Sequence, residues 1–304
     1  MQYQIESFKV KKRGKQVIVY VIILLLVLLV SISLGIVVAR KGNEEKTMGK
    51  LIETKANAKK VKKEEKQEQS KRNNEKQGDG TQGNLENKKQ FVKNVDQIYN
   101  GEKGKRVFLT FDDGPSEAVT PHILDTLKKY NVKATFFVLG NRVKLNPELI
   151  RREYREGHYI ANHSYSHEYS KIYKSSNAVL KEYNKTEEQI KRALGNENYS
   201  SNLFRFPGGS TGGEYDKVKE KAKKELEAKN IAYLDWNALT SDAAGADTKE
   251  KIMKNLEETV LYNNVVLLMH DAPDKILTYE TLEDVIKYLQ KKGYTFENMY
   301  DLIS

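Results

Sequence analysis

Apolar and polar positions follow three different patterns along the 304-residue chain. Residues 16–39 carry no charged side chain, and their centre is an unbroken aliphatic run from Val21 to Val30. As a helix this segment would be about 36 Å long, which exceeds the roughly 30 Å hydrocarbon core of a membrane. Five basic residues lie between positions 9 and 15, and the positive-inside rule keeps such residues in the cytoplasm. The pattern predicts a single-pass anchor in the cell membrane at 16–39, with residues 1–15 cytoplasmic and the rest extracytoplasmic.

A cleavable signal peptide is the alternative interpretation of this run. The residues Val37, Val38 and Ala39 could form a small-residue cleavage site. However, the apolar run is longer than the roughly 7–15 residues typical of such peptides. We therefore predict an uncleaved anchor, and under either interpretation the chain that follows is exported.

The second pattern, at residues 40–95, is dominated by Lys, Glu, Gln and Asn with scattered aliphatic residues. A segment of this composition buries too little apolar surface to offset the entropy lost on ordering. We predict a flexible charged linker here. Its lysines could also hold it against an anionic wall polymer or lipid headgroups.

The third pattern, at residues 105–304, alternates short apolar runs with helical periodicity. The apolar runs are bounded by Gly or Pro and lie at 107–111, 134–139, 203–206, 231–234 and 265–269. Between them the spacing predicts helices at 121–130, 147–156, 177–194, 217–229, 249–262 and 282–292. Repeated strand–helix units predict an α/β fold, either a small (β/α) barrel or an open doubly wound sheet. No glycine-rich phosphate-binding motif follows the first run, which disfavours a nucleotide-binding version.

Charge and cysteine content exclude several classes of function. The net charge of +10 suggests nucleic-acid binding, but residues 1–105 hold 23 of the 52 basic and 12 of the 42 acidic residues. The remaining two-thirds of the chain is therefore nearly neutral, so we predict no nucleic-acid partner for the folded part. The chain has no cysteine, which excludes disulfides, thiolate metal sites and cysteine nucleophiles.

Chemically active side chains follow several of the apolar runs, where α/β folds collect their active sites. Asp112 and Asp113 end the first run, and adjacent carboxylates are costly unless a cation neutralises them. Taken alone, they fit an ordinary Asp/Gly turn equally well. His163 and His167 have the i, i+4 spacing that would place both imidazoles on one face of a helical turn, where they could share a Zn²⁺. With an Asp as third ligand, one coordination position would stay open, as in catalytic zinc sites.

Two further motifs are weaker when taken singly. Arg205 precedes Pro207 and two glycines at the end of another run, so it could pair with an Asp while backbone N–H groups approach a ligand. His270 closes the last long run. A surface turn and a structural histidine are the alternatives for these two motifs.

Together these motifs resemble the polysaccharide deacetylase family of carbohydrate esterases, the domain of the rhizobial chitooligosaccharide deacetylase (NodB-like). The matching stretches occur in the family's order at 110–115, 163–167, 205–209, 235–243 and 268–270, and the resemblance covers about residues 105–304. The resemblance implies a distorted, partly open (β/α) barrel. It also implies one divalent metal ion, with Zn²⁺ the first candidate and Co²⁺ or Ni²⁺ admitted by nitrogen and oxygen ligands.

The resemblance also implies a role for each matching residue. The metal ligands would be Asp113, His163 and His167. The general base would be Asp112, positioned by Arg205, and the general acid would be His270. The backbone N–H of Gly208 would face the oxyanion, and Leu268 would form an apolar wall of the acetyl pocket.

The sequence departs from the family pattern in two places. An aromatic residue often follows the Pro of the Arg motif, whereas this chain has Gly208, which predicts a more open wall of the cleft. The family also has an Asp-Trp motif whose carboxylate steadies the acid histidine. Asp235-Trp236 matches it literally, but in another register the carboxylate would be Asp242. We predict Asp242 for this role, and Trp236 either lines the acetyl pocket or belongs to the core.

The predicted function is a metal-dependent hydrolase that removes N-acetyl groups from a GlcNAc-containing polysaccharide. The predicted anchor and a linker that spans about 40 Å as a coil would bring cell-wall peptidoglycan within reach. An N-acetylglucosamine biofilm polymer is another candidate substrate. The alternatives are an O-acetyl esterase acting on xylan or another glycan, and an inactive glycan-binding module. Every position that would supply the base, a metal ligand or the acid holds a residue type able to do so, which disfavours the inactive module.

Overall fold

The structure is a computed structural model that describes residues 82–100 and 104–302, within a compact unit that spans Asp79–Ser304. The predicted cytoplasmic segment 1–15, the anchor 16–39 and most of the linker lie outside the described residues. None of the helices in the described ranges has the length and apolar character needed to cross a bilayer.

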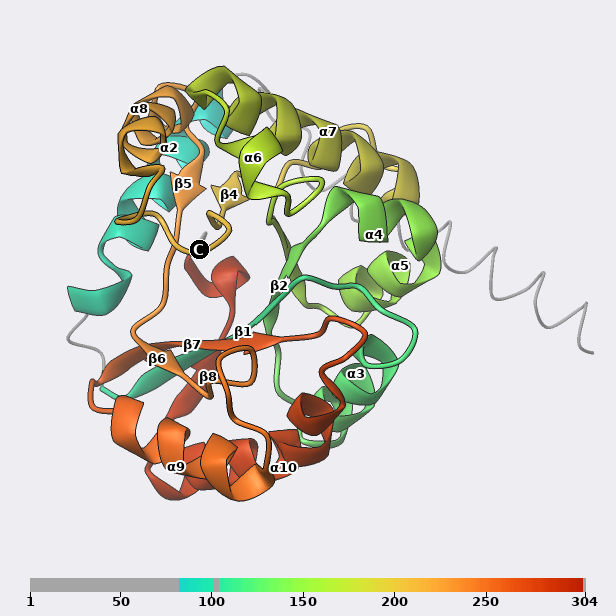
Figure 1. Cartoon of the computed structure of the whole chain (residues 1–304), viewed down its shortest axis with the longest axis vertical. Coiled ribbons are helices and arrows are strands. Elements are labelled where there is room, and N and C mark those ends of the chain that lie inside the picture. Colours follow the sequence, from blue (N-terminus) through green and yellow to red (C-terminus); the bar gives the residue numbers. More distant parts are fainter. Residues whose placement is uncertain (1–81, 101–103, 303–304) are drawn as a thin grey trace, which may run out of the picture. The chain divides into compact units, whose positions relative to one another are not determined.

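The centre of the fold is one parallel sheet that curls without closing (Figure 1). Its order is β5-β4-β3-β2-β1-β7-β6, and β8 pairs with β1 outside this path. The strands are β1 (Arg106–Asp112), β2 (Thr135–Val138), β3 (Tyr159–Asn162), β4 (Leu203–Phe204), β5 (Ala232–Tyr233), β6 (Ala238–Leu239), β7 (Asn264–His270) and β8 (Thr295–Glu297). Within the described part of the chain no pairing joins β5 to β6. The distorted, partly open barrel predicted from the sequence is therefore confirmed.

Helices pack on both sides of the sheet: most surround its outer side (Figure 1), and one packs on its inner side. They are α2 (Gln82–Asp96), α3 (Thr120–Lys129), α4 (Gly140–Leu145), α5 (Pro147–Arg155), α6 (Tyr169–Ile172), α7 (Ser176–Leu194), α8 (Asp216–Glu227), α9 (Lys249–Thr259) and α10 (Ile276–Lys291), with 3₁₀ turns η1 (Ile98–Asn100) and η2 (Met299–Leu302). The ends of α7 illustrate how the sequence sets these bounds. The Ser175 side chain accepts a hydrogen bond from the Ala178 N–H, and Gly195 closes the helix with φ of 61°.

Strand β1 organises the rest of the sheet. All seven of its residues are buried. It pairs along its whole length with β7, while its other edge pairs first with β8 and then with β2. This arrangement sets Asp112 beside His270 in register, at the carboxyl ends of two neighbouring strands. The predicted base, Asp112, and the predicted acid, His270, therefore lie at adjacent backbone positions of neighbouring strands.

The folded unit begins earlier than the sequence predicted. Residues 82–95, assigned to the flexible linker, form most of α2. Phe91 and Val95 of this helix and Ile98 of η1 are at most 3% exposed and join the cluster that fills the inner side of the sheet. The Asn94 side chain also donates to the Leu302 carbonyl at 2.7 Å. Three apolar residues at helical spacing therefore pack this otherwise polar segment against the sheet. The average composition of residues 40–95 is polar, so it did not predict this contact.

Candidate metal centre and active site

Asp112 and Asp113 point in different directions because the backbone turns between them. Asp112 is the last residue of β1 and is 2% exposed. Asp113 lies in the left-handed region with φ of 76°, and its backbone N–H still reaches the Phe137 carbonyl of β2. The Asp112 side chain therefore points into the protein interior at the end of β1, and the Asp113 side chain points toward His163 and His167.

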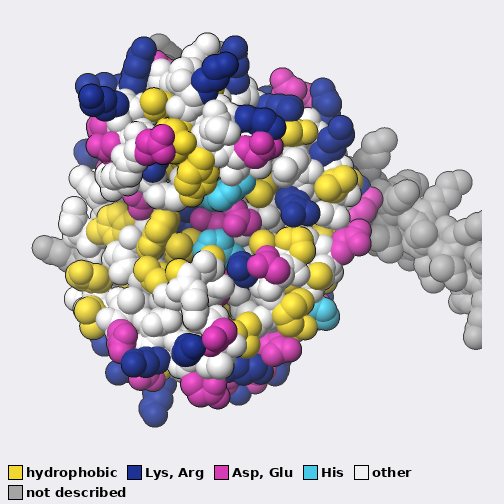
Figure 2. All heavy atoms as spheres, in the orientation of Figure 1, with side chains coloured by type: hydrophobic (Ala, Val, Ile, Leu, Met, Phe, Trp, Pro, Cys, Tyr) yellow, Lys and Arg dark blue, Asp and Glu magenta, His cyan; other side chains and the backbone are white. Residues whose placement is uncertain are grey.

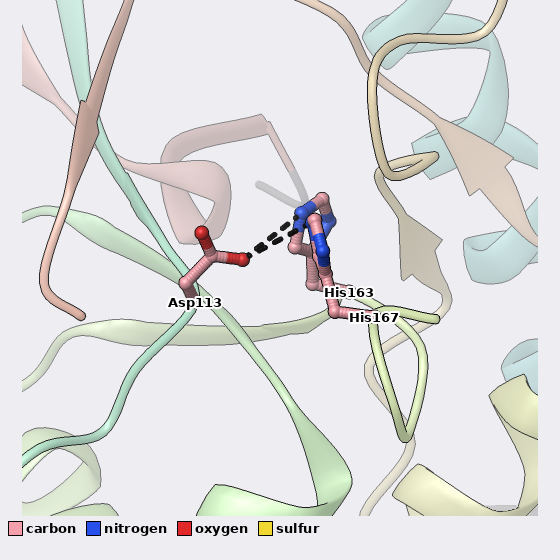
Figure 3. A group of neighbouring side chains, drawn as sticks. All are labelled: Asp113, His163 and His167. Carbon is pink, nitrogen blue, oxygen red and sulfur yellow. Dashed lines mark ion pairs between the residues drawn. The ribbon is translucent and has the colours of Figure 1, made fainter. Parts of the chain in front are cut away.

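Asp113, His163 and His167 converge on one point (Figure 3). Oδ1 of Asp113 lies 3.6 Å from Nε2 of His163 and 3.4 Å from Nε2 of His167. The ligand atoms all lie within 4.8 Å of one another. Oδ1 of Asp113 is buried and has no hydrogen-bond partner, which is costly for a carboxylate oxygen unless a cation meets it. One carboxylate oxygen and two imidazole nitrogens therefore fit a divalent metal ion and leave room for a further ligand.

The surroundings of His163 prepare its ring to bind a metal. Its Nδ1 lies 2.8 Å from the Arg205 carbonyl, so the N–H of a neutral ring belongs at Nδ1 and the lone pair at Nε2 faces Asp113. Burial lowers the pKa of His163 to about 3. The imidazole is thus neutral at any physiological pH, as a metal ligand must be.

The helical turn predicted for the His pair is wrong. Residues 163–168 form an irregular loop, in which Ser164 and His167 have φ of 74° and 58°. The Glu182 side chain of α7 accepts hydrogen bonds from the N–H groups of Tyr165 and Ser166 at 3.0 and 2.8 Å and from the Ser166 hydroxyl at 2.9 Å. A carboxylate from a distant helix therefore shapes the loop that brings the two imidazoles together.

Arg205 is completely buried and holds Asp112 in place. Its Nη1 donates to Asp112 Oδ1 and to the Thr110 hydroxyl, each at 2.8 Å. The rest of the guanidinium donates to backbone carbonyls of Leu234 and Asp235 at 2.9 and 3.0 Å, and it stacks 3.9 Å from the centre of the Phe137 ring. Burial raises the pKa of Asp112 and outweighs the opposing charge of Arg205. The carboxylate is thus fixed in position yet more basic than in water.

His270 is paired with Asp242, the second of the two carboxylates considered from the sequence. Oδ1 of Asp242 lies 2.9 Å from Nδ1 of His270, and Oδ2 accepts from the His270 backbone N–H at 2.7 Å and from the Thr278 hydroxyl at 2.8 Å. Asp235 instead accepts hydrogen bonds from the backbone and hydroxyl of Ser210. Burial favours the neutral imidazole, but the hydrogen bond and charge of Asp242, helped by Asp112 and Asp113, raise the pKa of His270 to about 9.

The remaining predicted residues lie around this centre. Leu268 of β7 is 8% exposed and lies two residues before His270 on the same strand. The centre of the half-buried Trp236 ring lies 5.8 Å from the Arg205 guanidinium, and a Cβ built on Gly209 would lie 3.5 Å from Cη2 of that ring. Gly208 is exposed, with φ of 73°. Figure 2 shows histidine and acidic side chains together in a hollow of this face, bordered by apolar side chains.

The open cleft wall predicted beside Gly208 is filled by another residue. A Cβ built on Gly208 would lie 2.5 Å from the Tyr169 hydroxyl. Sequence reasoning missed Tyr169, and it also missed Thr110, Glu182 and Thr278. Thr110 opens the 110–115 motif but was given no role, whereas Tyr169, Glu182 and Thr278 lie outside the motifs, and only the fold brings them to the site. The one available signal for Tyr169 was its place two residues after His167.

Comparisons with known proteins agree with this geometry. Residues 99–231 match the family model described as polysaccharide deacetylase. A peptidoglycan-N-acetylglucosamine deacetylase of Bacillus cereus is 33% identical over 219 residues, which are 70% of this chain and 76% of the relative. A peptidoglycan-N-acetylglucosamine deacetylase of Listeria monocytogenes is 34% identical over 212 residues, which are 68% of this chain but 41% of that longer relative. The solved structure of a Streptococcus mutans CE4 esterase superposes with a TM-score of 0.62 at 34% identity, covering 68% of this chain and 90% of that one.

Proposed function

Because the chain belongs to the polysaccharide deacetylase family, we propose that it is a metal-dependent hydrolase that removes N-acetyl groups from GlcNAc residues of peptidoglycan. One observation carries this proposal. The Asp113–His163–His167 cluster lies beside a buried carboxylate held by Arg205 and a histidine held by Asp242, and metal-dependent amide hydrolysis uses these groups as metal site, base and acid.

The metal would be held by Asp113, His163 and His167, with Zn²⁺ the first candidate. When bound, it would supply a Lewis acid that lowers the pKa of water and polarises the acetyl carbonyl. Asp112 would accept the proton of the attacking water, because Arg205 fixes its position and burial raises its pKa. The backbone N–H of Gly208 would donate to the developing oxyanion.

His270 would complete the reaction as general acid. With a pKa of about 9, its imidazole is protonated at neutral pH and can donate a proton to the leaving nitrogen. Water oxygen bonds to the acetyl carbon, the C–N bond breaks, and the products are acetate and a free amine on the sugar. Asp242 would stabilise the charged ring in its orientation.

The choice of peptidoglycan rests on the named relatives and on the N-terminal sequence. Two relatives carry names that describe peptidoglycan-N-acetylglucosamine deacetylases. The charge-free run at 16–39, preceded by basic residues, supports an anchor in the cell membrane with the catalytic unit outside. An anchored extracytoplasmic enzyme would meet the wall as its nearest acetylated polymer.

The test is acetate release by the Asp79–Ser304 unit from peptidoglycan, chitooligosaccharide and acetylated xylan, each with and without a chelator. The proposal expects chelator-sensitive release from peptidoglycan, with free amines formed in equal amount. Release from xylan alone would make the protein an O-acetyl esterase. Glycan binding without release from any substrate would make it a binding module.

Location has its own test. Protease treatment of intact cells should release a fragment that carries the C-terminus and is active in solution. If the C-terminus stays protected until the cells are lysed, the proposed orientation is wrong.

A further inference from the structure

The backbone at Gly208 leaves a space that a residue from elsewhere in the chain occupies. Besides the Tyr169 hydroxyl at 2.5 Å, a Cβ on Gly208 would meet Cζ and Cε2 of the same ring at 3.2 and 3.4 Å. The three nearest neighbours of that position are thus all atoms of one phenol ring. A side chain at 208 and the ring of Tyr169 cannot both be present in these positions.

Tyr169 is placed by the metal-binding loop. It is the first residue of α6 and follows His167 by two positions, and the two rings have centroids 5.6 Å apart. The ring also packs at a steep angle against Tyr173, whose hydroxyl donates to the Pro207 carbonyl at 2.6 Å. Tyr173 in turn stacks on Tyr215 at 5.2 Å. The ring of Tyr169 is therefore supported from behind by a fixed aromatic cluster.

Tyr169 nevertheless remains open to solvent in a way its neighbour does not. It is 40% exposed, whereas Tyr173 is 2% exposed. The described residues provide no hydrogen bond to its hydroxyl, although they pair the hydroxyls of Tyr159, Tyr173 and Tyr199. A partly exposed aromatic ring with an unpaired hydroxyl beside the active-site backbone is suited to a partly apolar, hydroxyl-rich ligand.

We propose that Tyr169 is the residue that positions the sugar. It binds the pyranose ring on its exposed aromatic face, and its hydroxyl donates to the substrate beside Gly208. This inference rests on the proposed function, since it concerns the glycan of the same site. The aromatic wall thus comes from the loop after His167 and not from the residue after Pro207.

The experiment compares Tyr169→Leu and Tyr169→Phe with Tyr154→Leu in the Asp79–Ser304 unit. Tyr154 is the matched control, because it is 42% exposed and packs against Tyr199 rather than against the metal loop. Initial rates are measured on chitotetraose and on ethyl acetate, which has no sugar ring. Thermal melting checks that the variants are folded.

Tyr169→Leu should raise KM for chitotetraose about tenfold, the size of one aromatic contact. It should change the rate on ethyl acetate less than twofold. Tyr169→Phe should give a smaller rise in KM, because it loses only the hydroxyl, and Tyr154→Leu should match the unsubstituted protein. An unchanged KM in Tyr169→Leu, or an equal loss on both substrates, would overturn the inference.

A binding measurement separates this inference from the proposed function. Trp236 is the chain's single tryptophan and lies at the site, so its fluorescence reports glycan binding without turnover. Titration with chitotetraose should give a Kd about tenfold weaker for Tyr169→Leu. If the unsubstituted protein binds the glycan but releases no acetate from any substrate, the proposed function fails while this titration still decides the role of Tyr169.

Discussion

Asp112 and Asp242 each meet a basic side chain, at 2.8 and 2.9 Å, but the two pairs leave the proton in different places. The partner of Asp112 is Arg205, which keeps its charge throughout the working pH range. The partner of Asp242 is His270, which can titrate. Burial raises the pKa of Asp112, whereas hydrogen bonds from His270 and Thr278 overcome burial and lower the pKa of Asp242. Asp112 is thus suited to accept a proton because burial outweighs the charge of Arg205, whereas Asp242 stays ionised and keeps a proton on His270.

The two pairs also differ in how they are attached to the fold. Arg205 is completely buried, and its guanidinium donates hydrogen bonds to Asp112, to the Thr110 hydroxyl and to two backbone carbonyls. Asp242 lies in a turn after β6, with Thr278 and the His270 backbone as its other partners. We infer that Arg205 and Asp112 stabilise the buried end of the sheet as well as serving catalysis, whereas Asp242 sets the charge of the His270 imidazole.

The largest contrast concerns the metal. His163→Ala removes one of the three proposed metal ligands, so we expect loss of bound metal and of detectable activity. His270→Ala removes the acid but no ligand, and it should keep about one metal ion per chain. Elemental analysis of both purified variants at neutral pH checks this. Full occupancy in His163→Ala would remove His163 from the ligand set.

The next effect is on turnover alone. Asp112→Asn keeps the shape of the side chain and an oxygen for Arg205 but cannot accept a proton. We expect kcat to fall by about 10²–10⁴-fold, the usual cost of removing a general base. Metal content measured on the same sample serves as the control. Turnover close to that of the unsubstituted protein would show that Asp112 is not the base.

Replacing Arg205, the partner of Asp112, should lower the free energy of unfolding. Arg205→Met leaves the buried Asp112 without its counter-charge, which typically costs about 3–5 kcal/mol. The midpoint of urea unfolding measures this cost. Lys129→Met is the control, because its ion pair with Glu283 is exposed to solvent and should contribute nothing measurable. Equal midpoints for the two variants would contradict the structural role of Arg205.

The smallest effect is a shift in pH dependence on the acid side. Activity should fall as pH rises through about 9, where His270 loses its proton. Asp242→Asn removes the main interaction that raises this pKa, so the alkaline limb of kcat should move to lower pH. The acid limb should stay in place, because Asp112 is untouched. An unmoved alkaline limb would contradict the pairing of acid and carboxylate.

The His270–Asp242 pair also contributes to the free energy of unfolding, and this contribution depends on pH. The pKa of His270 is raised above the unfolded value of 6.5 to about 9. Its stabilisation is therefore fully present below pH 6.5 and lost as pH rises through 9. In Asp242→Asn the difference in the free energy of unfolding between pH 6 and pH 9.5 should be smaller, and urea unfolding at the two pH values would measure it.

The sequence already indicated most of the proposed catalytic residues, because each stands at or directly after the end of an apolar run. Asp112 and His270 are the last residues of β1 and β7, and Arg205 directly follows β4; parallel strands bring such positions to one edge of the sheet. The strand–helix alternation was equally clear, since buried runs of β1 and β7 are long enough to recognise. The two-residue strands β5 and β6 were too short for periodicity to define their ends.

By itself, then, the sequence determined the fold class, the kinds of catalytic group and their order along the chain, because these follow from local patterns of burial and motif. Only the tertiary structure decided which groups meet. It paired His270 with Asp242 and Ser210 with Asp235, it bent the His loop around Glu182, and it brought Tyr169 over Gly208. It also added α2 to the core through Phe91 and Val95. The physical reason is the same in each case: a side chain's partner depends on which elements pack side by side, and spacing along the chain does not contain that information.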